Sequence, residues 1–92
     1  MIKYALFPLG RTVATPGALK LLEENNVSPS DLLERHQSGD WGMLSQEDYA
    51  ENKLSLKEGF RLLSAYKVGK EKVWIIMEAD RSSTCILLPS EY

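Results

Sequence analysis

The residues best suited to chemistry lie close together, between positions 36 and 41. His36 is the only histidine in the chain, and a histidine side chain titrates near neutral pH. With Asp40 to orient its ring and Ser38 or a substrate hydroxyl nearby, His36 is a candidate general acid or base. A structural role is the alternative: His36 complements the end of a helix, Ser38 and Asp40 bond a turn, and Trp41 fills the core.

A second polar cluster lies at positions 80 to 84, where Asp80 and Arg81 precede two serines and a threonine. An arginine among hydroxyl groups can hold a phosphate, but the carboxylate of Asp80 opposes an anion at the same place. We therefore expect a polar turn with a solvated ion pair.

Other chemistry is excluded by what the sequence lacks. It has no phosphate-binding glycine loop, no G-x-S-x-G, no H-E-x-x-H and no C-x-x-C. One histidine and one cysteine cannot supply the four ligands of a structural zinc site, so we expect no metal and no cofactor. The single Cys85 cannot form an internal disulfide, which indicates a cytoplasmic setting. No run of 18 apolar residues occurs, so we expect neither a transmembrane helix nor a signal peptide.

The charges are unevenly distributed along the chain. The formal net charge is -2, with nine acidic and four basic residues between positions 17 and 58, and five basic and four acidic residues from position 59 onward. Lys67, Lys70 and Lys72 gather near one turn, but they fall short of the basic surface that phosphate backbones require. Nucleic acid is therefore a disfavoured partner.

Three helices are predicted in the first two thirds of the chain. Thr15 and Pro16 favour a helix start, and the pattern continues to about residue 25. Ser28 and Pro29 repeat the device for a helix that frays near 38–39, and a third helix runs from Ser45 to a glycine at position 59. Before them, the segment 2–13 predicts a short strand followed by a turn around positions 8–10.

From position 60 the hydrophobic period changes to two, which predicts strands at 60–68, 73–77 and 84–88. We therefore expect a single α+β domain over residues 1–92, with an N-terminal strand, two to three short helices and a three-stranded antiparallel meander. For the first hairpin, a two-residue turn would set Lys67 opposite Lys72. We favour a four-residue loop, which sets Val68 opposite Val73.

Both faces of this meander are apolar. One presents Leu62, Tyr66, Val73, Ile75, Met77, Ile86 and Leu88, and the other presents Leu63, Ala65, Trp74, Ile76, Cys85 and Leu87. Either the helices cover both faces, or a homodimer or another protein covers one of them. The candidate interaction residues are Trp41, Leu63, Trp74, Ile76 and Leu87.

Several segments resemble a family of small bacterial proteins found on plasmids and other mobile elements. They are LFPLG at 6–10, VATPGAL at 13–19, RHQSGDWG at 35–42, RLLSAY at 61–66 and the stretch from 72 to 92. Some members are linked to the modification subunit of type I restriction systems, but this chain has neither an N-P-P-[FY] motif nor a cofactor-binding glycine loop. The resemblance therefore implies a bacterial, cytoplasmic setting and no activity.

We accordingly expect an accessory protein that acts by protein interaction, through one sheet face or the surface around Trp41. The alternative is an enzyme. The order of helices before a meander resembles the small ribonuclease toxins of the RelE and barnase type, in which His36 with Arg61 or Arg81 would cleave RNA. The candidate catalytic residues are thus His36, Asp40, Arg61 and Arg81.

Overall fold

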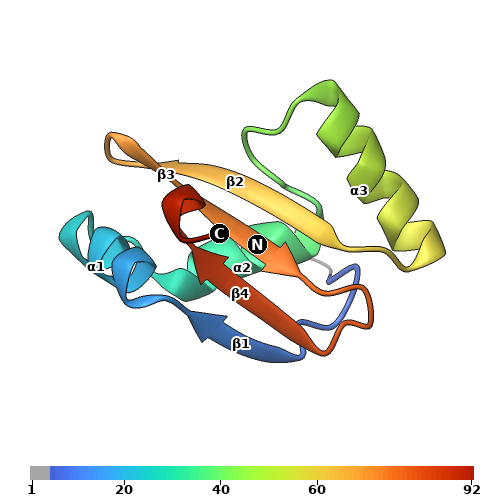
Figure 1. Ribbon diagram of the computed structural model, residues 1–92, viewed down its shortest axis with the longest axis horizontal. Coiled ribbons are helices and arrows are strands. Elements are labelled where there is room, and N and C mark those ends of the chain that lie inside the picture. The colour runs from blue at the N-terminus through green and yellow to red at the C-terminus, as the bar shows by residue number, and fades with distance from the viewer. Residues whose placement is uncertain (1–4) are drawn as a thin grey trace.

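The computed structural model describes residues 5–92 and has the expected α+β architecture (Figure 1). The elements follow in the order β1 (Arg11–Ala14), α1 (Pro16–Glu24), α2 (Pro29–Ser38), α3 (Gln46–Glu58), β2 (Leu62–Val68), β3 (Glu71–Met77), β4 (Ser83–Leu87) and a 3₁₀ turn, η1 (Pro89–Glu91). The strands form one sheet in the order β1-β4-β3-β2. β1 runs parallel to β4, whereas β2, β3 and β4 form the predicted antiparallel meander.

The three helices begin and end where their capping residues predict. Thr15 accepts a hydrogen bond from the Ala18 amide in front of Pro16, and Ser45 accepts one from the Asp48 amide. Gly39 and Gly59 follow α2 and α3 with φ of 94° and 80°, left-handed values that glycine adopts without steric cost. These local signals set where the helices begin and end.

Residues 5–7 do not form the N-terminal strand that was predicted there. Residues 2 and 4 of that prediction lie outside the described part of the chain, and residues 5–10 contain no strand. The strand instead follows Gly10, at Arg11–Ala14, where it extends the meander to four strands. A Cβ atom on Gly10 would approach the carbonyl oxygens of Arg81 and Ser82 to 2.5 and 2.6 Å, so the backbone passes too close for a side chain there. β1 pairs with β4, where Arg11 faces Ser83. Because this partner lies far along the chain, local patterning could not place the strand.

The first hairpin also differs from the prediction. Lys67 does face Lys72, and Val68 faces Glu71, so Gly69 and Lys70 form a two-residue turn rather than a four-residue loop. Gly69 has φ of 63°, the left-handed value that this turn requires at its first central position. Both lysines are exposed, so water screens their repulsion. The two alternatives differ by a shift of two residues, which leaves every side chain on the same face.

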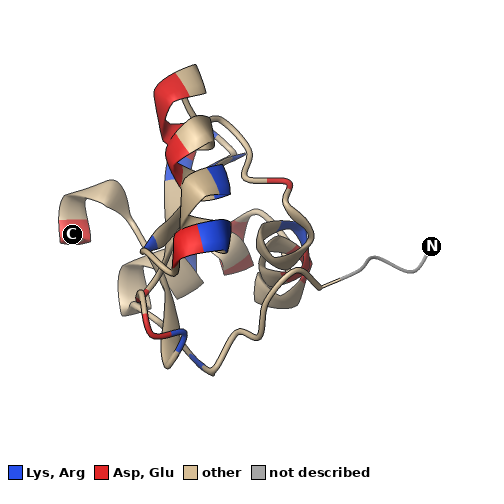
Figure 2. Ribbon diagram, turned by 90° about the vertical axis from the view of Figure 1, so that its right-hand side faces the viewer, with Lys and Arg blue, Asp and Glu red and all other residues tan. Residues whose placement is uncertain are grey.

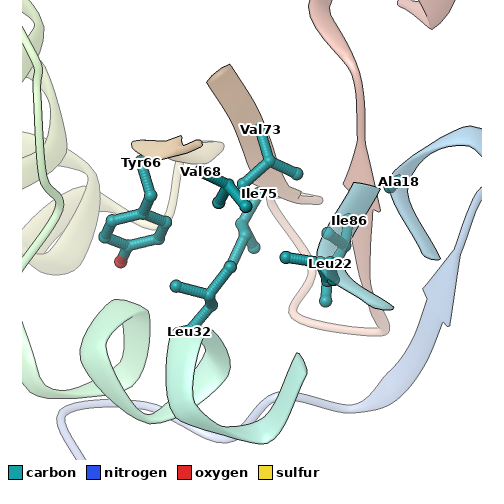
Figure 3. Packing of buried hydrophobic residues seen from close by; sticks show 8 residues of the cluster. All are labelled: Ala18, Leu22, Leu32, Tyr66, Val68, Val73, Ile75 and Ile86. Atoms are coloured by element: carbon teal, nitrogen blue, oxygen red, sulfur yellow. The ribbon is translucent and has the colours of Figure 1, made fainter. Parts of the chain in front are cut away.

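The sheet separates two different environments. α1 and α2 cover one face, called the helix-covered face here, and pack on Tyr66, Val73, Ile75 and Ile86 (Figure 3). A second cluster of Phe7, Trp41, Leu62 and Met77 continues this core toward the other end of the strands. Figure 2 shows α2 and the C-terminal turn on opposite sides of the sheet. We call the side of the C-terminal turn the open face, because none of α1, α2 and α3 lies across it (Figure 1).

The outer edge of β2 is closed by side-chain and loop contacts. Asn52, buried on α3, donates to the Leu63 carbonyl (2.5 Å) and accepts from the Leu63 amide (3.1 Å). One step along, the Trp41 carbonyl accepts from the Ala65 amide (3.1 Å) and the Met43 amide donates to the Ala65 carbonyl (2.7 Å). These contacts occupy the outward backbone groups of Leu63 and Ala65, which an edge strand otherwise leaves unpaired.

Replacing Asn52 with alanine should lower the free energy of unfolding by about 2 kcal/mol, because it leaves two backbone groups of β2 without a partner in a buried place. Urea unfolding followed by circular dichroism measures this loss. Glu51→Ala, an exposed neighbour on the same helix, is the matched control and should change stability by less than about 0.5 kcal/mol. Equal effects of the two substitutions would show that Asn52 does not secure this edge.

Candidate functional site

The cluster around His36 lies inside the protein. The His36 ring is fully buried, with Nδ1 hydrogen-bonded to the Ser64 hydroxyl (2.5 Å) and the Phe7 ring edge-on at 5.3 Å. Nε2 is buried and has no hydrogen-bond partner among the described residues. Burial first, and the nearby Arg81 charge second, lower the pKa of His36 to about 4. The ring is therefore neutral at pH 7 and presents no nitrogen to solvent.

The residues after His36 brace the end of α2. Asp40 pairs with Arg35 (2.7 Å), and its carbonyl accepts from the Tyr66 hydroxyl (2.6 Å). Ser38 donates to the Arg35 carbonyl (3.1 Å). The Trp41 indole is 2% exposed and donates to the His36 carbonyl (3.1 Å). These contacts match the structural alternative, and they place Trp41 in the core rather than on a surface.

The two candidate arginines lie apart. Arg61 hydrogen-bonds the Tyr92 hydroxyl and lies 5.8 Å from the centre of that ring. Arg81, at a φ of 61°, donates to the carbonyls of Phe60 (2.6 Å) and Ser55 (3.0 Å), which ties the end of α3 to the β3–β4 turn.

The last turn differs from its prediction as well. The Arg81 guanidinium donates its hydrogen bonds to backbone carbonyls, and Asp80 instead accepts from the Ser82 amide (2.9 Å). The hydrogen bonds from Ser82 lower the pKa of the Asp80 carboxyl. The expected ion pair between Asp80 and Arg81 is therefore not formed. Arg81 instead forms a backbone clamp, meaning its hydrogen bonds to the carbonyls of Phe60 and Ser55. The sequence signal for this clamp is weak, because nothing local marks carbonyl groups contributed by a distant helix.

Four of the five predicted interaction residues lie on the open face. The register places Ala65, Trp74 and Leu87 in one cross-strand row, and Leu63, Ile76, Cys85 and Val13 in the next. Ile76 and Leu87 are buried by their neighbours, at 8% and 7% exposure, whereas Leu63, Trp74 and Cys85 are half-buried and Val13 is 42% exposed. The predicted face therefore forms, and its accessible part is Leu63, Trp74, Cys85 and Val13.

Charged and aromatic groups border this apolar area. Lys67 and Lys72 lie side by side at the hairpin end of the open face, both exposed and without an ion pair among residues 5–92. At the opposite end of β2, a pocket of about 260 Å³ separates the strand from α3 and is lined by Asp48, Glu51, Asn52, Ser55, Phe60, Arg61 and Leu63. Figure 2 shows acidic residues along α3. The border is thus cationic at the hairpin and mixed near α3.

The C-terminal residues cover part of the open face. η1 packs on β3, and the Tyr92 ring meets the Trp74 ring at 5.8 Å. Glu91 accepts from the Thr15 hydroxyl (2.6 Å) and from the Leu88 amide (2.9 Å), which anchors this turn beside β1. The prediction ended the last strand at Leu88, but β4 ends at Leu87 and Leu88 is instead the N-cap of η1.

Within residues 5–92, no three side chains of the histidine, cysteine, aspartate or glutamate type lie close enough together to hold a metal ion. Over the same residues, none of the helices combines the length and the apolar character needed to span a bilayer.

Comparison with known proteins gives no family for this chain. No protein-family model, no curated protein and no solved structure matches it.

Proposed function

We propose that this protein is a binding module that recognises another protein through the open face of its sheet. The observation that supports this most is the half-exposed apolar area of Leu63, Trp74 and Cys85. An antiparallel sheet in a monomer usually presents polar side chains on an uncovered face, whereas apolar faces mark interaction sites. Trp74 has the size and partial exposure of an interface anchor.

The charge around the face indicates the chemistry of the partner. Lys67 and Lys72 place two unpaired ammonium groups beside Trp74 on the same face. A partner with acidic side chains next to its apolar residues would gain from both groups, because complementary charge speeds association and fixes orientation. We therefore propose an acidic, apolar protein segment as the ligand, with its acidic end over the hairpin.

Two copies packed face to face fit the charges less well. The open face carries Lys67 and Lys72 at one end and exposed Arg61 and Arg11 at the other. A two-fold axis that runs along the strands would bring the two lysine ends together, and one that runs across the strands would place the lysine end of one copy on the arginine end of the other. Like charges across an interface are unfavourable, which supports a different protein as the occupant.

The ribonuclease alternative has little support in the geometry. Its histidine is fully buried and neutral, and Arg61 lies on the opposite side of the sheet from it. A bacterial, cytoplasmic setting on a mobile element remains part of our proposal, supported by the quoted sequence segments and by the single Cys85.

Selection of binders from a random peptide library displayed on phage tests the proposed ligand. The selected peptides should combine aspartate or glutamate with apolar residues, and a synthetic copy should bind the wild-type protein in a titration. Trp74→Ala together with Lys67→Glu and Lys72→Glu should weaken this binding at least tenfold, because the anchor is lost and the charge is reversed.

The matched control reverses two exposed lysines on helices, Lys20→Glu on α1 and Lys53→Glu on α3, which should leave binding within twofold. Both variants need wild-type circular dichroism before they are compared. Peptides without acidic residues, or peptides whose binding survives the open-face substitutions, would contradict the proposal.

A further inference from the structure

The two edges of the sheet differ in what covers them. At β2 the backbone groups of Leu63 and Ala65 are already bonded to Asn52 and to residues 41–43. At β1 the Arg11 amide bonds the Ser82 carbonyl and the Thr15 amide bonds the Ile86 carbonyl, each at 2.9 Å. Because side chains and backbone groups alternate along a strand, Val13 also points its backbone toward β4.

The intervening residues of β1 therefore point their backbone groups away from the sheet. By this alternation, Thr12 and Ala14 each aim an amide and a carbonyl at the outer side of β1. No hydrogen bond to either amide is found beyond the strand among residues 5–92. Four backbone groups are thus available to a further strand.

We propose that β1 binds β1 of a second copy of this chain, in antiparallel orientation, with Val13 opposite Val13 of the second copy. In this register Thr12 faces Ala14 of the second copy, so all four outward groups of each strand find a partner. The two Val13 side chains meet as a non-hydrogen-bonded pair on the open face, where paired side chains lie closest. The result is one eight-stranded sheet with a closed two-fold axis.

Neighbouring registers fit worse. Shifting by two residues in one direction places Val13 beside Arg11 of the second copy. Shifting in the other direction places Thr12 opposite Pro16, which has no amide hydrogen to donate. Only the register centred on Val13 pairs the apolar side chains and satisfies Thr12 and Ala14 together.

Charge supports the same register. It sets Arg11 opposite Thr15 of the second copy, and the Thr15 hydroxyl already holds the exposed Glu91 carboxylate. The guanidinium of one copy therefore approaches the carboxylate of the other, and the two-fold axis repeats this pair. Arg11 has no ion pair among the described residues of its own chain.

Sedimentation equilibrium tests this pairing. Four residues from each copy make a small interface, so we expect a reversible dimer with a dissociation constant of roughly 0.1 mM. Val13→Lys sets two ammonium groups opposite each other and should yield a monomer at about 1 mM. Leu54→Lys, on an equally exposed leucine of α3, is the control and should leave the dimer intact.

Disulfide trapping tests the register itself. Val13→Cys should give an oxidised dimer when combined with Cys85→Ser, because Cys85 lies beside Val13 on β4 and would otherwise capture the new thiol. Thr12→Cys in the same Cys85→Ser background should stay monomeric. A wild-type monomer at about 1 mM, a dimer that survives Val13→Lys, or no crosslink at position 13 would each overturn the proposal.

Discussion

Replacing Trp41 with alanine is expected to lower the free energy of unfolding by about 3 to 5 kcal/mol, the range for a large aromatic side chain removed from a core. The indole is 2% exposed and meets the Tyr49 ring at 4.9 Å. It also donates to the His36 carbonyl, and its own carbonyl holds the Ala65 amide at the edge of β2. One substitution thus disturbs the core, the end of α2 and the sheet edge. Urea unfolding measures the loss.

The second tryptophan provides the matched control. Trp74→Ala removes the same side chain from the open face, where it is half-exposed, and should cost clearly less than Trp41→Ala. Trp41→Phe keeps most of the ring and should lose about 1 to 2 kcal/mol for the hydrogen bond and the reduced volume. Similar losses for Trp41→Ala and Trp74→Ala would mean that the two tryptophans do not occupy different environments.

Acidification is expected to destabilise the protein through His36. Burial lowers the pKa of His36 from its ordinary value of 6.5 to about 4. Between these two pH values His36 is protonated in the unfolded chain but stays neutral in the folded one. This contribution to stability is complete above pH 6.5 and is lost as the pH falls toward 4. The pKa difference corresponds to about 3 kcal/mol, most of it between pH 6.5 and 4.5.

His36→Asn isolates this effect. Asparagine retains a polar group near the Ser64 hydroxyl but does not titrate, whereas the carboxyl groups of the chain titrate in both proteins. The difference in unfolding free energy between wild type and variant should therefore shrink as the pH is lowered from 7.5 to 4.5. A difference that stays constant over this range would show that His36 is not held neutral by burial.

Local signals predicted the helices well because capping is local chemistry. Thr15, Ser45, Gly39 and Gly59 each act within one turn of the chain, and each helix ends within a residue of its predicted limit. The alternation of the last three strands likewise placed Leu63, Trp74 and Ile76 on one face, as observed.

The sequence did not predict which strands pair or in which register. Whether Arg11–Ala14 pairs with anything depends on β4, which lies far along the chain. The hairpin register was argued from the repulsion of Lys67 and Lys72, an energy that water reduces at an exposed site. The left-handed preference of Gly69 was the stronger local signal, and it indicates the two-residue turn.

The site around His36 shows the same division. The sequence left a catalytic and a structural role open for these residues, and the choice between the two depended on whether the His36 ring is buried. Ser64 offered a clue, because it is a hydroxyl at a core position of an apolar strand and a buried hydroxyl needs a partner. Asn52 on the thinly apolar α3 carried a similar signal, since a buried amide also needs one.

The central claim, that the open face is the binding surface, is tested most directly by NMR chemical-shift mapping with the selected acidic peptide. We expect shifts of backbone amides to concentrate at Leu63, Lys67, Lys72, Trp74 and Cys85. Leu22 and Leu32, buried between the helices and the helix-covered face, should stay unchanged. Shifts centred on α1 and α2, with the open face unaffected, would contradict it.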